Sequence, residues 1–127
     1  FKLFNDTYGH LSGDQTLIRI AEVIKGVIKR PGEFAARYGG EEFVAILMNT
    51  TAEGAAFVAE QIRTRVEELG IENREIKNVV TVSLGVASVV PDNEMEPNEL
   101  IDAADRALYK AKEYGRNNVT VWESQQE

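Results

Sequence analysis

The chain has 127 residues, of which 43% are hydrophobic and 28% charged, and its formal net charge is −7. These values predict one globular domain with a genuine core. The lack of cysteine excludes disulfides and thiolate metal sites, and the single histidine, His10, leaves little material for a zinc site or a Ser-His-Asp triad. The acidic charge argues against nucleic acid as the main partner. No apolar run approaches the length of a membrane span, and there is no signal-peptide pattern.

The first part of the chain predicts a short helical piece and then a long helix. Phe1 and Phe4 lie three residues apart, and turn residues follow up to Gly13. Residues 12–15 read Ser-Gly-Asp-Gln, a capping box that begins an amphipathic helix, and Pro31-Gly32 ends that helix. The predicted buried stripe comprises Leu17, Ile20, Ala21, Ile24, Val27 and Ile28.

The middle of the chain predicts a hairpin and a second helix. Residues 34–48 contain two apolar runs joined by Gly39-Gly40, and glycine supplies the positive φ of a tight turn at little steric cost. A second capping box at residues 50–53 begins a helix that Gly70 closes. Its expected buried side comprises Ala55, Val58, Ala59, Ile62, Val66 and Leu69. Residues 72–78 are polar and fit either a loop or a weak edge strand.

The last part predicts a strand, a helix and a final strand. Residues 80–87 alternate between larger apolar and small side chains, so we expect a helix or a ligand to pack closely on the small face. Pro97 fits the first turn of a third helix, Gly115 its C-cap, and residues 119–122 a last strand. The helix stripe comprises Leu100, Ile101, Ala104, Ala107, Leu108 and Ala111. The order predicts an α+β fold, with helices packed on a mainly antiparallel sheet whose first strand we expect just upstream of Phe1.

Two acidic residues, Glu41 and Glu42, follow the glycines of the hairpin. At the mouth of a turn neither can be fully buried, and both lie near bare backbone. Backbone N–H groups and hard oxygen ligands are what a magnesium-bound triphosphate requires. A plain hairpin with a solvated acidic pair is the alternative for these residues.

Four motifs together resemble the GGDEF family, the catalytic domain of diguanylate cyclases. Residues 37–43, Arg-Tyr-Gly-Gly-Glu-Glu-Phe, resemble its signature in the variant with Glu at the third position. Residues 1–14, 81–87 and 103–117 resemble its second signature, its central strand, and its last helix with the exit turn. The resemblance covers essentially the whole chain. It implies a single GGDEF-like domain, residues 1–127, of ferredoxin-like or nucleotide-cyclase palm type that lacks its N-terminal strand.

The resemblance implies a diguanylate cyclase, which condenses two GTP into cyclic di-GMP and two pyrophosphates for bacterial signal transduction. It implies Mg2+ or Mn2+ as the cofactor, an antiparallel homodimer for catalysis, and an upstream sensor domain in a longer cytoplasmic or membrane-anchored protein. We expect this domain itself to contact neither nucleic acid nor membrane. The alternative is a catalytically silent regulatory module that binds GTP or cyclic di-GMP.

The resemblance also implies roles for the acidic pair and for two polar residues near the start. Glu41 would be a magnesium ligand that helps activate the attacking hydroxyl, and Glu42 would lie close to the second metal. Asn5 and Asp14 would grip guanine, since an amide and a carboxylate can pair with the N1 and amino hydrogens that adenine lacks. The alternative for Asn5 is a structural role in a turn. The alternative for Asp14 is a favourable interaction of its charge with a helix N-terminus.

The remaining implied contacts hold phosphates. Backbone N–H groups at Phe1 and Lys2, and at Gly39-Gly40, would cradle the phosphate oxygens. Lys112 and Arg116 would neutralise the terminal phosphates. The alternative for these two cations is a favourable interaction with the negative end of the helix dipole. His10 we expect to be structural.

Two departures from the family pattern matter. The family has a further metal-binding Asp just before the Phe-Lys of this chain, so residues 1–127 lack one expected ligand and the chain alone could be inactive. Residues 30–33 match the family's Arg-x-x-Asp product-inhibition site only as Arg30 and Glu33, and the position of a supporting arginine holds Gln61. The longer Glu33 puts the bidentate geometry in doubt, so we expect weak or absent product inhibition.

Overall fold

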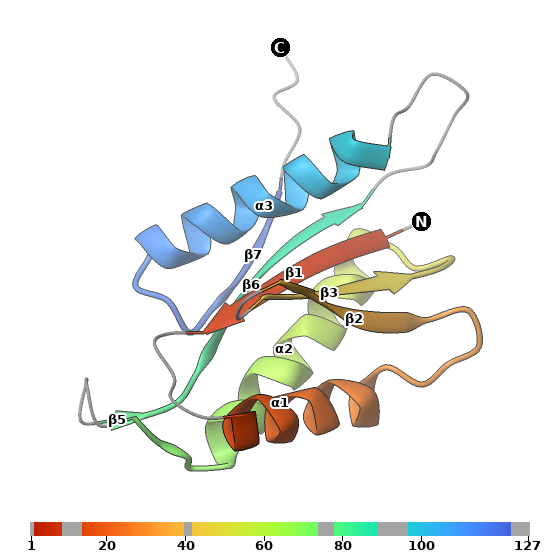
Figure 1. Ribbon diagram of the computed structural model, residues 1–127. Coiled ribbons are helices and arrows are strands. Elements are labelled where there is room, and N and C mark those ends of the chain that lie inside the picture. Colours follow the sequence, from red (N-terminus) through yellow and green to blue (C-terminus); the bar gives the residue numbers. More distant parts are fainter. Residues whose placement is uncertain (1, 9–13, 40–41, 74–77, 89–96, 123–127) are drawn as a thin grey trace.

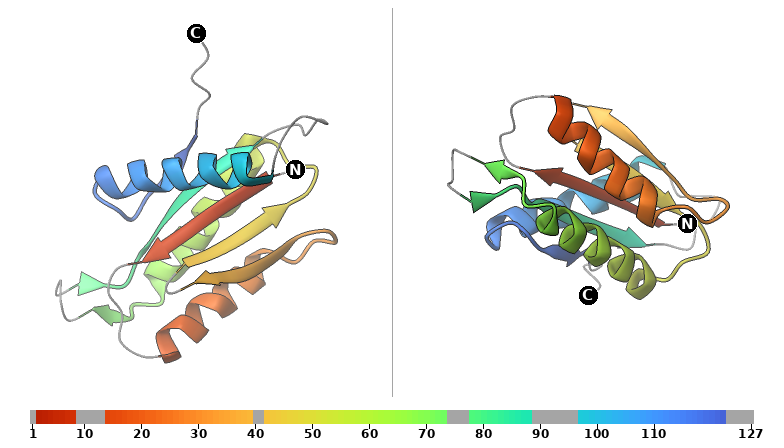
Figure 2. Two further views of the ribbon diagram at one scale, coloured as in Figure 1. Left: turned by 45° about the horizontal axis from the view of Figure 1, so that its top comes forward. Right: turned by 90° about the horizontal axis from the view of Figure 1, so that it is seen from below.

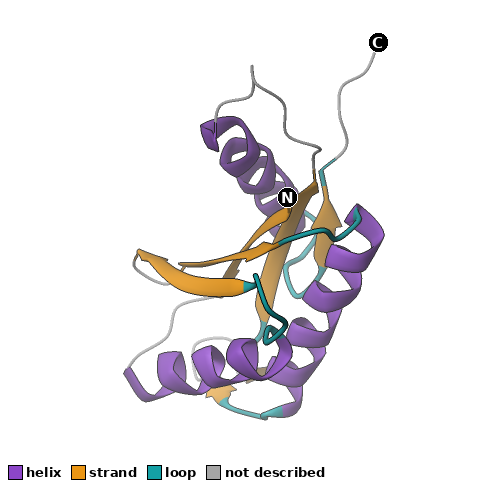
Figure 3. Cartoon of the chain, turned by 90° about the vertical axis from the view of Figure 1, so that its right-hand side faces the viewer, coloured by secondary structure: helices purple, strands orange, loops and turns teal. Residues whose placement is uncertain are grey.

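A computed structural model of the protein describes residues 2–8, 14–39, 42–73, 78–88 and 97–122. The main sheet lies between two layers of helices, with α1 and α2 on one face and α3 on the other (Figures 1 and 3). In chain order the elements are β1 (Lys2–Tyr8), α1 (Asp14–Val27), β2 (Phe34–Gly39), β3 (Glu42–Leu47), α2 (Ala52–Glu68), β4 (Glu72–Asn73), β5 (Asn78–Val79), β6 (Val82–Ser88), α3 (Pro97–Glu113) and β7 (Val119–Val121).

The main sheet has five strands in the order β2-β3-β1-β6-β7. All its pairs are antiparallel except β6 with β7, which run parallel because α3 crosses over between them. The short strands β4 and β5 pair with each other in the stretch that fitted either a loop or an edge strand. The predicted α+β class with a mainly antiparallel sheet is therefore confirmed.

The prediction of a helical piece at the start of the chain is wrong. Residues 2–8 form β1, the first strand of the sheet in this structure, which lies between β3 and β6; we had expected the first strand upstream of Phe1. Each of those two neighbours would otherwise present a row of unpaired backbone N–H and C=O groups. Aromatic and β-branched residues in this segment favour a strand. Hydrogen bonding to a strand on each side outweighs the helical signal of Phe1 and Phe4, which covers only four residues.

Two apolar clusters hold the layers together, one on each face of the sheet. Between the sheet and α1 and α2 lie buried side chains that include Ile20, Ile24, Phe43, Ala45, Leu47, Ala55, Ala59, Ile62, Val66, Val82, Leu84 and Val86. On the α3 face, Ala87 packs with Leu100, Ala103 and Ala104, and Val44 and Ile46 border them. Alternate residues of β3 thus enter opposite clusters, as strand geometry requires. In the view from below, α1 and α2 lie side by side beneath the sheet (Figure 2).

The small face of β6 packs against a helix, which decides between the two possibilities left open by the sequence. A Cβ on Gly85 would lie 2.3 Å from both the Ala104 carbonyl oxygen and the Leu108 amide nitrogen of α3. Only glycine permits this approach of the two backbones. The position of α3, including its C-terminal end, therefore depends on Gly85.

The ends of the helices lie close to the predicted signals where the structure describes them, but the N-cap of α2 is one residue later than the capping box predicted at residues 50–53. Thr51 is the N-cap of α2, and its side chain accepts a hydrogen bond from the Gly54 N–H at 3.0 Å. Gly70 and Gly115 follow α2 and α3 with φ of 67° and 108°. Residues 12 and 13 of the first capping box lie outside the described residues, and α1 begins at Asp14. Within the described part of the chain, none of the helices has the length and hydropathy needed to cross a membrane.

Candidate active site

The hairpin of β2 and β3 fixes the backbone of Glu42 at one end of the sheet. Phe43 is 7% exposed and belongs to the cluster beneath α1 and α2. Because side chains alternate along a strand, half-exposed Glu42 belongs to the opposite face, which α3 covers. The β2–β3 register shifts between Arg37 and Gly39 just before the turn. Gly40 and Glu41 lie outside the described residues.

Glu42 shares a row of the sheet with a buried serine. The register pairs Thr7 of β1 with Glu42 on one side and with Ser83 on the other. Two strand spacings, about 10 Å, therefore separate the backbones of Glu42 and Ser83. The Ser83 side chain, on the face that α3 covers, accepts a hydrogen bond from the Asn117 N–H at 3.0 Å. The turn that follows α3 is thus anchored about two strands from the hairpin carboxylate.

The two predicted phosphate-binding cations flank the end of α3. Lys112 is half-buried in the last turn, and Arg116 is exposed just beyond it, with φ of 65°. Among the described residues neither cation forms an ion pair. The C-terminal end of α3, the end of β2 and the start of β3 lie at the same end of the sheet (Figure 1). The end of α3 that carries Lys112, and the turn with Arg116 that follows it, therefore lie at the end of the sheet where β3 begins with Glu42.

The residues predicted to contact guanine are not brought together in the same way. Asn5 lies in the middle of β1, opposite Val44 and Gly85, in a row over which α3 passes. Asp14 is the first residue of α1, which lies on the other face. The guanine contacts stay a prediction. Lys2 begins β1, and Phe1 lies outside the described residues.

The residues at the expected product-inhibition site pair with each other. The Arg30 Nε lies 3.0 Å from a Glu33 carboxylate oxygen, and the Glu33 side chain is 5% exposed. The other carboxylate oxygen accepts from the Arg30 N–H at 3.2 Å. Arg30 Nη2 also reaches the Thr50 hydroxyl at 3.4 Å. Both oxygens of the Glu33 carboxylate are therefore occupied within its own turn.

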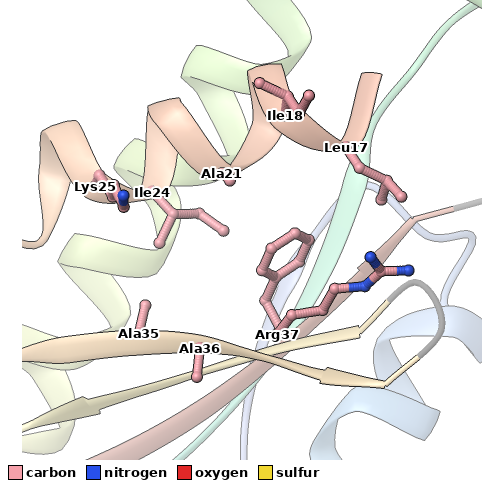
Figure 4. Close-up of a pocket in the computed structure, with 9 residues that line it drawn as sticks. Leu17, Ile18, Ala21, Ile24, Lys25, Ala35, Ala36 and Arg37 are labelled. Atoms are coloured by element: carbon pink, nitrogen blue, oxygen red, sulfur yellow. The ribbon is translucent and has the colours of Figure 1, made fainter. Parts of the chain in front are cut away.

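A cavity of about 370 Å³ lies between α1 and the hairpin, on the face opposite Glu42. Its lining is mostly apolar, with Lys25 and Arg37 toward opposite ends (Figure 4). The lining residues are Leu17, Ile18, Ala21, Ile24, Lys25, Ala35, Ala36, Arg37 and Phe43. Arg37 has an interaction within the protein and is not a free cation.

Sequence reasoning missed a polar cluster that joins α2 to the turn after α3. Arg63 is bound by Glu60 and Glu67 on its own helix and by Asn117 from beyond α3. The hydrogen bond with Arg63 lowers the pKa of Glu60 and, from the other side, raises the pKa of Arg63. The spacing of three and four residues between these charges on α2 was a readable signal for pairs within the helix. The contact with Asn117 spans 54 positions and has no such local signal.

The predicted metal site depends on carboxylate donors that gather at one place. Within that part of the chain, no group of three or more His, Cys, Asp or Glu side chains gathers as a metal site. Glu42 is the described member of the predicted acidic pair, and its carboxylate forms no ion pair with another described residue. Carboxylate oxygens are the hard donors that Mg2+ and Mn2+ prefer, so the donor type fits.

The layered sheet and its acidic hairpin define the palm-type fold of nucleotide cyclases. Among solved structures, the GGDEF domain of DgcB from Caulobacter crescentus in complex with c-di-GMP has a TM-score of 0.83 and 35% identity, over 97% of this chain and 78% of that one. The active GGEEF domain of a diguanylate cyclase from Vibrio cholerae has a TM-score of 0.83 and 30% identity, over 98% of this chain and 83% of that one.

The chain belongs to the GGDEF family, since residues 1–118 match the family described as "Diguanylate cyclase, GGDEF domain". Diguanylate cyclase A of Treponema denticola is 48% identical over 121 residues, which cover 95% of this chain and 32% of the relative. The probable diguanylate cyclase DgcT of Escherichia coli K12 is 46% identical over 123 residues, 95% of this chain and 27% of the relative. The chain thus spans about a third of the length of these relatives.

Proposed function

We propose that the protein condenses two GTP into cyclic di-GMP and two pyrophosphates. The observation that supports this proposal is that Glu42 and two cations with no carboxylate partner among the described residues lie at the same end of the sheet. Glu42 begins β3 at the end of the sheet where α3 ends, with Lys112 in its last turn and Arg116 in the turn that follows. A triphosphate with its metal needs both signs of charge, and these residues supply both at the same end of the sheet.

In the proposed reaction, each 3′-hydroxyl oxygen forms a bond to the α-phosphorus of the other GTP. The bond from that phosphorus to the pyrophosphate oxygen breaks, and the hydroxyl proton passes to solvent water. Lys112 and Arg116 would neutralise the charge that accumulates on the departing phosphates. Backbone N–H groups at Gly39-Gly40 would hold the phosphate oxygens in place. Lys2 pairs with Leu47 and Ser88, at the end of β1 away from Glu42, so the structure does not support the predicted role of its N–H group.

Glu41 and Glu42 would hold Mg2+ or Mn2+, which when bound lowers the pKa of the attacking hydroxyl and stabilises charge on the phosphate. The family resemblance assigns the N1 and amino hydrogens of guanine to Asn5 and Asp14. Pairing with both would require the middle of β1 and the start of α1 to approach each other when the nucleotide binds. Rejection of ATP would follow, since adenine would leave these polar groups unpaired. Replacing Asp14 by Asn should therefore narrow the preference for GTP over ATP.

Two copies of the chain are needed for this reaction. One chain offers one nucleotide site, and the product has two-fold symmetry, so the productive species would be an antiparallel homodimer. A regulatory domain elsewhere in a longer protein would control its formation. These assignments concern the whole protein, of which the present chain would be the catalytic part.

The test uses the full-length protein that contains this chain, incubated with GTP and Mg2+, with chromatography of the nucleotides. We expect cyclic di-GMP, no product after chelation with EDTA, and a loss of turnover of at least about a hundredfold for Glu41→Gln or Glu42→Gln. Exposed Glu22 in the middle of α1 supplies the matched control, and Glu22→Gln should turn over normally. GTP that is bound but recovered unchanged would instead identify the silent regulatory module.

A further inference from the structure

The turn after α3 has a backbone that side chains with a Cβ disfavour. Gly115, Arg116 and Asn117 have φ of 108°, 65° and 51° in succession. Glycine adopts this left-handed region freely and asparagine tolerates it, whereas arginine gains nothing from it. Such a conformation persists only where its surroundings hold it, and it is a reason to look for a function.

Part of the turn is held by α3 itself. The Gly115 N–H donates to the Lys112 carbonyl at 3.2 Å, and the Arg116 N–H donates to the Ala111 carbonyl at 3.0 Å. This is the Schellman pattern, which explains one left-handed residue after a helix. It does not explain why Arg116 and Asn117 continue in the same region.

The side chain of Asn117 supplies the missing restraint by joining the turn to α2. Its Oδ1 accepts from Arg63 Nη1 at 3.0 Å, and its Nδ2 donates to Glu67 Oε2 at 3.1 Å. Arg63 Nη1 also donates to the other Glu67 oxygen at 3.3 Å, which closes a ring of three side chains. The Arg63 Nε also donates to the Glu60 carboxylate at 2.9 Å, and the Arg63 side chain is 17% exposed. The ring is therefore partly shielded from water and has a defined geometry.

The backbone of Asn117 joins the same turn to the sheet. Its N–H donates to the hydroxyl of Ser83, which is 3% exposed and shares its row with Glu42. One residue is thus fixed to α2 by its side chain and to β6 by its backbone. Arg116, which directly precedes it, forms no ion pair with the other described residues.

We propose that Asn117, held by Arg63 and Glu67, is a positioning residue that keeps Arg116 in place for the terminal phosphates of the nucleotide. This inference rests on the proposed function, because that function supplies the phosphate. The fixed turn spares Arg116 the ordering cost of a mobile segment when the ligand binds. Asn117 itself need not touch the nucleotide.

The experiment compares Asn117→Gly with Asn49→Gly in the full-length protein. Both asparagines are left-handed, with φ of 51° and 54°, so glycine keeps each backbone and removes each side chain. Asn49 follows β3, whose C-terminal end lies away from the turn between β2 and β3 (Figure 2). Calorimetric titration with inorganic tripolyphosphate and Mg2+ is the readout, beside thermal unfolding of each variant.

We expect Asn117→Gly to weaken tripolyphosphate binding about tenfold while Asn49→Gly leaves it unchanged. Arg116→Ala should weaken binding similarly, and adding Asn117→Gly to it should have little further effect, because both act through the same guanidinium. Fully additive losses, or binding by Asn117→Gly equal to that of the unaltered protein, would overturn the inference and leave the proposed function standing. An unaltered protein that neither binds tripolyphosphate nor converts GTP would overturn both.

Discussion

Replacing Gly85 by alanine tests how closely α3 must approach the sheet. The new Cβ would lie 2.3 Å from the Ala104 carbonyl oxygen and from the Leu108 amide nitrogen, and 2.8 Å from the Leu108 Cα. An ordinary contact needs about 3.5 Å, so α3 would have to withdraw by roughly 1 Å. A gap of that size forfeits roughly a quarter to a half of the dispersion energy at the interface. All the obstructing atoms belong to backbone, so no side chain can turn aside.

We expect Gly85→Ala to lower the free energy of unfolding by about 3 kcal/mol, at the upper end of the usual range for overpacking. For a domain of this size the midpoint of thermal unfolding should fall by roughly 10 °C. GTP turnover at a temperature where the variant is folded should also fall, because Lys112 and Arg116 are carried at the end of α3.

Urea unfolding followed by circular dichroism measures the effect, with Gly26→Ala as the matched control. Gly26 lies within α1, and a Cβ there would meet nothing within 4 Å. Alanine is the better helix former, so this control should stabilise the protein by about 0.5–1 kcal/mol. If Gly85→Ala unfolds within about 0.5 kcal/mol of the unaltered protein, the close approach of α3 is not what holds the site.

Three further predictions follow from single contacts. Hydrogen bonding to Arg63 lowers the pKa of Glu60 below its ordinary value of 4.5. The contribution of this pair to the free energy of unfolding is therefore present above pH 4.5 and is lost as the pH falls through the lowered pKa. Glu60→Gln should therefore cost roughly a few tenths of a kcal/mol at neutral pH, because solvent screens the pair. Urea titrations at pH 7 and at successively lower pH values should show the difference shrinking below pH 4.5, and a constant difference would contradict this. Thr51→Ala removes the N-cap of α2 and should cost about 1 kcal/mol in the same assay, whereas no change would mean that the cap is dispensable. Cyclic di-GMP should bind weakly at Arg30, since Glu33 already occupies it; tight binding by calorimetry that Arg30→Ala abolishes would refute this reading.

Most of the fold could be predicted because its signals are local. Buried residues at helical spacing, the capping threonine and the glycine after α2 are read within a few positions of each element. The Gly39-Gly40 pair between two apolar runs predicted the hairpin in the same way. These features depend on backbone preferences and on burial of one face, which neighbouring residues largely determine.

The failures came from contacts between distant segments. Residues 2–8 form a strand because β3 and β6 pair with them, and four residues with two aromatics could not indicate this. The small face of β6 predicted a close neighbour without identifying it as α3. The ring of Arg63, Glu67 and Asn117 depends on how α2 lies beside the turn after α3, and that arrangement exists only in the folded chain.

The most direct measurement of the central claim is the ratio of the two products. Full-length protein would be incubated with GTP and Mg2+, and cyclic di-GMP and pyrophosphate would be quantified in the same samples over time. The proposed condensation predicts two pyrophosphates for each cyclic di-GMP. The Glu42→Gln variant should form neither product. GDP with inorganic phosphate, or GTP recovered unchanged from the folded protein, would contradict it.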